Sequence, residues 1–256
     1  MIIIKNLWEN FSDKFGRSII HPQYIMRSYT YEAIKEAKRY AKGKLVDIGC
    51  GTMSYRKELE PQLELYVGVD HPQSSKLYSP KRRPDVLADA SELPFDKNMF
   101  DTALILQVLE YVKSPQNVID EAVRVLKPGG ILILTSPFLY PLHDIPYDRA
   151  RYSETFLRDL VHNSSLQIVK LKVQGSFLDF WLQSLNVFLL KKINNILSDK
   201  KLINMILVLP LMIITIFIVL SNNIIVAITR KKPKIFKNHE NYFPLDYLLI
   251  ARKNKF

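Results

Sequence analysis

The sequence predicts an α/β fold, in which a mostly parallel sheet carries helices on both faces. Three observations predict it. Residues 44–48 form a short apolar strand that ends in a turn with two glycines, Gly49 and Gly51. About twenty residues later, the spacing of a βαβ unit, residues 66–70 form a second apolar strand. Further apolar strands then alternate with helical segments, which is typical of a parallel sheet.

The glycine turn predicts a ligand built on adenosine. Glycines between a strand and a helix let the backbone pass close to a ligand without a Cβ in the way. The helix that follows presents free amide groups. Asp70 closes the second strand, where an acidic side chain suits ribose hydroxyls.

The turn also separates two kinds of adenosine cofactor. A dinucleotide fingerprint requires a third glycine, and that position is Ser54 here. Asp47 precedes Gly49 by two residues, where a carboxylate would repel a pyrophosphate but can pair with the ammonium group of an amino acid. The order Asp47-x-Gly49-x-Gly51 resembles the first motif of class I S-adenosylmethionine-dependent methyltransferases.

Three later segments extend this resemblance to about Gly43–Gly175. Residues 86–95 resemble the stretch whose acidic residue, Asp89 here, accepts from the adenine amino group. Residues 100–112 resemble the fourth strand and the loop beyond it, and residues 121–134 resemble the helix, turn and fifth strand of the type 11 branch. That branch includes quinone-biosynthesis enzymes and many enzymes of lipid and polysaccharide pathways.

The resemblance implies a Rossmann-like class I methyltransferase sheet, mostly parallel with an antiparallel last strand, and S-adenosyl-L-methionine as cofactor. His71 is expected to stack near the adenine, and Cys50 to be a small residue tolerated in the turn. The sequence departs from the family pattern at Met53, where a glycine is common, and at Tyr111, where a histidine is common. The residues expected to bind the cofactor are Asp47, Gly49, Cys50, Gly51, Asp70, His71, Asp89, Ala90 and Gln107.

The segment after the fifth strand, residues 137–153, is the predicted acceptor site, because α/β sheets bind ligands at the carboxyl ends of their strands. It resembles the P-L-H-x-x-P-x-D-x-x-R-Y segment of a type 11 subgroup. His143 is the candidate catalytic base, and Tyr147, Arg151 and Tyr152 are candidates for orienting the substrate. Alternatively, an Asp148–Arg151 pair only braces the loop and His143 is structural. The histidines and acids show no metal-ligand spacing, so no metal is predicted.

Composition places the excess charge at the two ends of the chain. The 256 residues carry a net charge of +11, to which residues 1–42 contribute 8 − 4 = +4, residues 43–176 contribute 16 − 17 = −1, and residues 177–256 contribute 12 − 4 = +8. A single cysteine fits a reducing compartment, and no removable signal peptide is evident. We therefore expect a cytoplasmic protein whose ends bind an anionic partner.

A long insertion separates the last two predicted strands, residues 166–173 and 246–252. A structureless connection of that length is improbable in a compact domain. We therefore divide the chain into a helical cap at 1–42, a methyltransferase core at 43–176, a hydrophobic helical insertion at 177–243, and the last strand with a basic tail at 244–256.

The insertion predicts membrane contact on the cytoplasmic face. Its second segment, residues 202–220, carries no charge and would rise about 28 Å as a helix, close to the thickness of the hydrocarbon core.

A single crossing of the membrane by this segment would separate the last strand from its sheet. A re-entrant or surface-lying hairpin, broken near Pro210 or at residues 221–223, avoids this. Two full crossings are disfavoured because Asp179, Gln183 and Asn186 would lie in lipid. The alternatives are a buried cap over the site or an interface for oligomers.

The N-terminal segment leaves two interpretations open. Leu7, Trp8, Phe11 and Phe15 stand at helical spacing and could lie on lipid or form a lid, ahead of a helix at residues 29–40.

The predicted function is methyl transfer to an oxygen of a lipid-linked, quinone-like or saccharide small molecule at a membrane surface. The alternative from another class is a non-catalytic membrane adaptor. A nucleic-acid methyltransferase is not expected, because the basic residues flank apolar runs and the N/D-P-P-Y/F motif is missing.

Overall fold

The structure, a computed structural model, describes residues 11, 15–16, 18–75, 83–198, 202–230 and 242–255, with the backbone alone at 202–207. The chain forms two compact units. We call Thr30–Phe138, Leu142–Gln174 and Asp246–Phe256 the sheet unit, and Met1–Tyr29, Leu139–Pro141 and Gly175–Leu245 the helical unit. This division places the first part of the predicted N-terminal cap with the insertion and the second part with the core.

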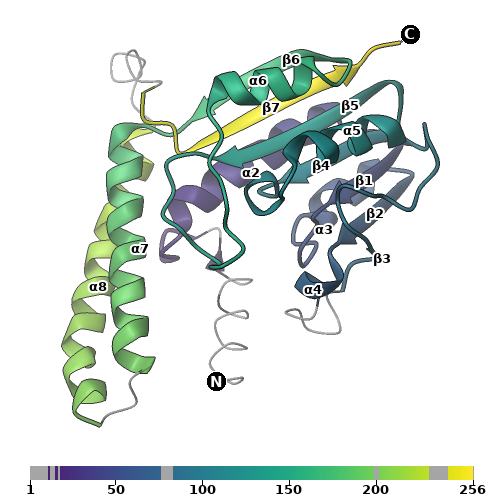
Figure 1. Cartoon of the computed structure of the whole chain (residues 1–256). Coiled ribbons are helices and arrows are strands. Elements are labelled where there is room, and N and C mark those ends of the chain that lie inside the picture. The colour runs from purple at the N-terminus through teal and green to yellow at the C-terminus, as the bar shows by residue number, and fades with distance from the viewer. Residues whose placement is uncertain are drawn as a thin grey trace. The chain divides into compact units, whose positions relative to one another are not determined.

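A seven-stranded sheet forms the centre of the sheet unit (Figure 1). Its order is β3-β2-β1-β4-β5-β7-β6, and only β7 runs antiparallel to its neighbours, between β5 and β6. This confirms the predicted Rossmann-like class I methyltransferase sheet with an antiparallel last strand. The strands are β1 (Lys44–Ile48), β2 (Leu65–Asp70), β3 (Val86–Leu87), β4 (Phe100–Leu106), β5 (Leu126–Pro137), β6 (Leu166–Gln174) and β7 (Asp246–Lys253).

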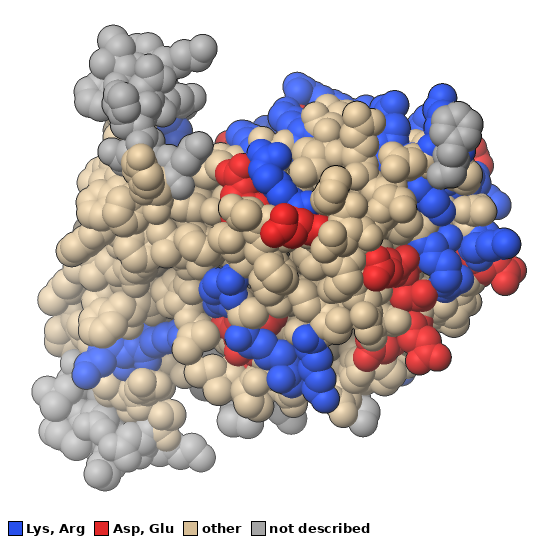
Figure 2. Space-filling view, turned by 45° about the horizontal axis from the view of Figure 1, so that its top comes forward, with Lys and Arg blue, Asp and Glu red and all other residues tan. Residues whose placement is uncertain are grey.

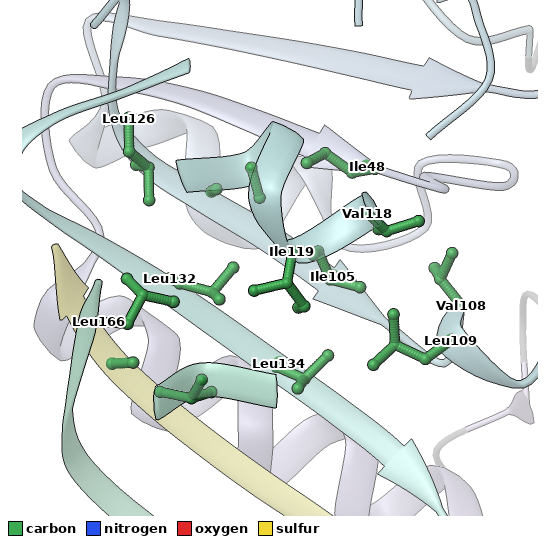
Figure 3. Close-up of a cluster of buried hydrophobic side chains, with 14 of the residues drawn as sticks. Ile48, Ile105, Val108, Leu109, Val118, Ile119, Leu126, Leu132, Leu134 and Leu166 are labelled. Carbon is green, nitrogen blue, oxygen red and sulfur yellow. The ribbon is translucent and has the colours of Figure 1, made fainter. Parts of the chain in front are cut away.

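Helices cover both faces of this sheet, because successive residues of a buried strand point to opposite sides. Leu104 packs with the part of α2 (Tyr24–Tyr40) that lies in the sheet unit and with Leu59 of α3 (Arg56–Leu59). Ile105 packs on the other face with α5 (Pro115–Val125) and α6 (Glu154–His162). Figure 3 shows this second cluster, in which Val118 and Ile119 of α5 lie over side chains of the sheet. Short helical turns complete the unit: η1 (Glu60–Gln62), α4 (Pro72–Ser75) and η3 (Leu109–Tyr111).

Two long helices, α7 (Phe177–Ser198) and α8 (Leu202–Thr229), run side by side in the helical unit (Figure 1). The predicted break at residues 221–223 is wrong, because α8 continues through them and through Pro210. Asn222 donates to the amide oxygen of Asn186 on α7 at 2.7 Å. The side chain of Asn223 donates to the carbonyls of Ile19 and His21 at 2.6 and 3.0 Å. The two amides are thus satisfied by neighbouring segments and do not compete with the helix for its own backbone groups.

Only α8 passes a length and composition test for a membrane helix among the described residues, over Val208–Thr229. The polar residues of α7 that argued against a crossing, Asp179, Gln183 and Asn186, are buried in the structure. Of the predicted N-terminal apolar face, Phe11 and Phe15 lie together with ring centroids 5.3 Å apart. Leu7 and Trp8 lie outside the described residues.

Candidate active site

The glycine turn after β1 is held by its backbone. The amides of Gly49 and Cys50 both donate to the carbonyl of Val69, at 2.8 and 3.0 Å, which ties the turn to the end of β2. Gly49 has a φ of +73°, and a Cβ at this position would lie 2.4 Å from Cγ2 of Val108. Only glycine therefore lets the turn approach the end of β4 this closely.

The departure at Met53 is accommodated by a second glycine. Met53 has a φ of +52°, the left-handed conformation that glycine adopts most easily. A Cβ on Gly68 in β2 would lie 2.7 Å from its sulfur and 2.9 Å from the sulfur of Cys50. The absent side chain at residue 68 thus makes room for both. Burial raises the pKa of the Cys50 thiol far above its usual range, which excludes this residue as a nucleophile at neutral pH.

Asp70, at the end of β2, is fixed beside the turn. One of its carboxylate oxygens accepts from the amide of Gly51 at 2.8 Å, and the other accepts from the amide of His71 at 2.7 Å. This places a preoriented carboxylate where the sequence predicted the contact with ribose.

Asp47 is buried beneath the same turn and is hydrogen-bonded to the hydroxyl of Tyr66. Burial raises its pKa to about 7, the bond from Tyr66 opposes the rise, and the nearby charge of Asp70 adds to it. A cationic group beside Asp47 would favour the charged carboxylate. The environment therefore fits the ammonium group that the sequence assigned to this position.

Asp89 and His71 come together at the other side of the turn. An oxygen of Asp89 lies 4.0 Å from Nε2 of His71. The other oxygen accepts from the amide and hydroxyl of Ser91, and these bonds lower the pKa of the carboxyl. Ala90, also predicted to bind the cofactor, follows Asp89 and is partly buried. Asp89 and His71, the two residues predicted at the adenine, thus lie close together in the sheet unit.

Gln107 was predicted to bind the cofactor, and the structure shows what fixes it. Its backbone is left-handed, with a φ of +56°. Its side-chain amide donates to the hydroxyl of Thr135 and to a carboxyl oxygen of Asp246, both at 3.0 Å. Gln107 therefore links the ends of β4, β5 and β7.

The predicted acceptor loop forms a polar network around His143. Nε2 of His143 lies 2.8 Å from the hydroxyl of Tyr111, and Nδ1 lies 3.1 Å from a carboxylate oxygen of Asp148. Arg151 binds Asp148 with two hydrogen bonds, at 2.5 and 2.7 Å. These bonds hold the pKa of Asp148 at about 2, so it remains a carboxylate. The tyrosine hydroxyl also donates to Asp144 at 3.1 Å.

The other two predicted substrate residues lie apart from this network. The hydroxyl of Tyr152 donates to the carbonyl of Leu109, and its ring stacks on Phe156 with centroids 4.8 Å apart. The side chain of Tyr147 is 55% exposed. Tyr152 therefore braces the loop, whereas Tyr147 is available to a ligand.

The sequence prediction missed two buried acids at this sheet edge, Glu110 and Asp246. Burial raises the pKa of each to about 8. Asp246 starts β7 opposite Pro137 at the end of β5. An antiparallel last strand must begin at the carboxyl ends of the parallel strands. The predicted start of the last strand could therefore have placed Asp246 at this edge of the sheet. Glu110 lies in η3, four residues after the end of β4, and was not singled out because its burial depends on the loop at 143–152.

Comparison with known proteins agrees with this geometry. Residues 46–134 match a family model described as a methyltransferase domain. An uncharacterized protein of Methanocaldococcus jannaschii is 28% identical over 177 residues, which cover 67% of this chain and 81% of that protein. The demethylmenaquinone methyltransferase of Paenarthrobacter aurescens is 33% identical over 123 residues. That match covers 46% of this chain and 46% of the enzyme, so the chain spans less than half of that relative.

A solved structure shows the same fold over nearly the whole chain. The S-adenosylmethionine-dependent methyltransferase of Thermotoga maritima superposes with a TM-score of 0.53 at 19% identity, covering 97% of this chain and 96% of that protein. The matching segment contains the glycine turn, Asp70 and Asp89. Residues 46–134 therefore form a methyltransferase domain that matches the type 11 family model, on a fold shared with class I S-adenosylmethionine-dependent methyltransferases, and this implies S-adenosylmethionine as the cofactor.

Proposed function

We propose that this chain transfers the methyl group of S-adenosylmethionine to an oxygen of an amphipathic small molecule at the cytoplasmic face of a membrane. The acceptor class is lipid-linked, quinone-like or saccharide. One observation carries the proposal: His143, with Tyr111 on one ring nitrogen and Asp148 on the other, lies at the same edge of the sheet as the glycine turn and Asp70.

The network around His143 suits the removal of a proton from a hydroxyl. When bound, the cofactor supplies an activated methyl group, so the protein mainly positions the acceptor and takes its proton. Asp148 is a carboxylate close to Nδ1, which favours the N–H at that nitrogen and leaves Nε2 as the acceptor. Tyr111 can turn its hydroxyl to Asp144, which frees Nε2 for the proton of a substrate. Arg151 fixes Asp148 and thereby the orientation of the imidazole ring.

Two observations support an amphipathic acceptor. The exposed surface of α8 is apolar, and residues 177–256 carry a net charge of +8, a combination that suits an anionic lipid surface. The Paenarthrobacter relative is named as a demethylmenaquinone methyltransferase, which supports a quinone-like acceptor.

The experiment uses purified protein, radiolabelled S-adenosylmethionine and membrane extract from the same host, followed by partition of the label between organic and aqueous phases. We expect protein-dependent label in the organic phase. The variant His143→Asn should reduce the rate by about 100-fold or more, the usual loss on removing a general base, with unchanged cofactor affinity. His162→Asn, at an exposed histidine of α6, is the matched control and should transfer at the wild-type rate.

Three results would contradict parts of this proposal. Label in the aqueous phase alone would replace the amphipathic acceptor with a polar one. Equal rates for His143→Asn and wild type would remove His143 as the base. Cofactor binding without any transfer would favour the non-catalytic adaptor, because a methyltransferase fold does not by itself establish activity.

A further inference from the structure

Helix α8 presents one stripe of side chains to its neighbours and leaves the rest exposed. Val208, Thr215, Val219, Asn222 and Val226 are buried and follow helical spacing. The exposed side chains are almost all apolar, and no charged residue occurs between 202 and 229. The large apolar side chains exposed on α8 are Leu209, Ile213, Ile214, Ile216, Phe217, Ile224, Ile225 and Ile228.

Several polar side chains between α7 and α8 bond to partners within the helical unit. Asn186 donates to the side-chain oxygen of Asn223 at 3.2 Å and accepts from Asn222 at 2.7 Å. Arg230, just after α8, pairs with Asp179 at 3.1 Å and lies over the ring of Tyr29. These polar side chains face the interior of the helical unit, and the outward face of α8 is left to apolar side chains.

Helix α7 differs from α8 because its C-terminal end is polar. Lys191, Lys192, Asn194, Asn195 and Ser198 are all exposed there. Two adjacent lysines two-thirds of the way along the helix would lie inside the hydrocarbon if α7 crossed a bilayer, which is costly. Figure 2 shows a second contrast: the surface of the two helices is mostly free of charge, whereas Lys, Arg, Asp and Glu are spread over the surface of the sheet unit.

Connectivity excludes a crossing by α8 alone. The chain enters α7 from β6 and leaves α8 toward β7, and these two strands pair with each other from Leu166–Lys253 to Gln174–Asp246. Both ends of the hairpin therefore lie on the same side of any membrane. Since α7 does not suit a crossing, α8 cannot cross either.

We infer that the α7–α8 hairpin lies in one leaflet of an anionic membrane, with the exposed face of α8 in the acyl-chain boundary and Lys191 and Lys192 of α7 among the headgroups. This rests on the membrane part of the proposed function and selects one of the topologies that the sequence left open. Anionic lipid is favoured over a second copy of the chain because the hairpin region is positively charged, and two copies would bring like charges together.

The first test measures binding of the full chain by co-sedimentation with two kinds of vesicle. One kind is a mixture of phosphatidylglycerol and phosphatidylcholine, and the other is pure phosphatidylcholine. Phe217→Asp places a charge on the exposed face of α8 and should weaken binding at least tenfold. Asn195→Asp, at an exposed position of α7, is the matched control and should change binding less than threefold. Pure phosphatidylcholine should bind the wild type more weakly than the mixture. Equal binding of both variants, or of both vesicle types, would overturn the inference.

The second test distinguishes an interfacial hairpin from a crossing one. Nitroxide labels are placed at Phe217→Cys and Asn195→Cys in a Cys50→Ser background, and collisions with oxygen and with a water-soluble nickel complex are measured. With vesicles, the label at 217 should meet oxygen and the label at 195 should meet nickel. A collision ratio that places the label at 217 near the bilayer midplane would indicate a crossing, because residue 217 lies near the middle of α8. An immobilised label at 217 without vesicles, in a concentration-dependent dimer, would assign this face to a second copy.

These outcomes are separable from those of the proposed activity. Vesicle binding without methyl transfer would overturn the activity and leave the hairpin inference intact. Methyl transfer without vesicle binding would overturn the hairpin inference and leave the activity intact.

Discussion

The two units of this protein place their polar and apolar groups in opposite ways. In the sheet unit, apolar side chains fill both faces of the sheet, while acids and amides gather at the carboxyl ends of the strands, where a ligand can bind. In the helical unit, asparagines and an Arg–Asp pair are buried between helices, while large apolar side chains face outward. The first arrangement suits water and a polar ligand, and the second suits lipid.

The difference shows that burial of polar groups has two uses in one chain. In the helical unit, buried amides bond to each other and to backbone carbonyls, which fixes how the helices pack. In the sheet unit, buried carboxyls have raised pKa values, and a ligand or a proton must complete their environment. Groups of the second kind are candidates for chemistry, whereas groups of the first kind are structural.

The largest effect is expected from removing the ribose contact in the sheet unit. Asp70→Ala deletes the carboxylate that is fixed by Gly51 and His71. Two charge-assisted hydrogen bonds of about 1.5–3 kcal/mol each would be lost, so affinity for S-adenosylmethionine should fall at least 100-fold in calorimetry. Asp96→Asn, at an exposed acid of the same unit, should bind like the wild type. A loss below fivefold for Asp70→Ala would show that this carboxylate does not hold the cofactor.

An intermediate effect is expected from the buried acid Glu110. Its folded-state pKa is raised from 4.5 to about 8, so the folded protein binds more protons than the unfolded chain between these values. Stability is therefore present at low pH and is lost as the pH rises through about 8. The variant Glu110→Gln cannot ionise at this position. As the pH rises, its free energy of unfolding should therefore fall by roughly 2–3 kcal/mol less than that of the wild type. Thermal unfolding followed from pH 5 to 9 measures it, and parallel curves for variant and wild type would contradict the assignment.

A smaller effect of opposite sign is expected from His21 in the helical unit. Burial, with the nearby charge of Arg27, lowers its pKa from 6.5 to about 4. The unfolded chain then binds more protons between pH 4 and 6.5, so stability is present above 6.5 and is lost as the pH falls through 4. As the pH falls, the free energy of unfolding of His21→Gln should decrease by roughly 1–2 kcal/mol less than that of the wild type. The same unfolding series extended to pH 4 checks it, and an unchanged acid limb would show that His21 does not titrate as assigned.

The sequence predicted the sheet well because its signals are local. The glycine turn, the acids that close β1 and β2, and the alternation of β6 each depend on neighbouring residues, and the antiparallel last strand came from the family resemblance. The break at residues 221–223 was predicted wrongly for the opposite reason. Asn222 and Asn223 favour a turn by local propensity, but their partners Asn186 and Ile19 are far away in the sequence.

The candidate site was predictable in part for the same reason. Asp47, Asp70 and Asp89 could be named from motif spacing, and His143 from its loop. The partnership of Tyr111 with His143, and the burial of Glu110 and Asp246, depend on three segments that meet only in the folded chain. Met53 could be identified as a departure, but only the fold shows that Gly68 makes room for it.

The most direct test of this division of roles measures labelled methyl transfer from S-adenosylmethionine into the organic phase of membrane extract, for the wild type and for Phe217→Asp. The account predicts equal cofactor affinity for both proteins and at least tenfold less organic-phase label for the variant. Equal label from both proteins, at equal cofactor affinity, would show that the apolar face of α8 has no part in reaching the acceptor.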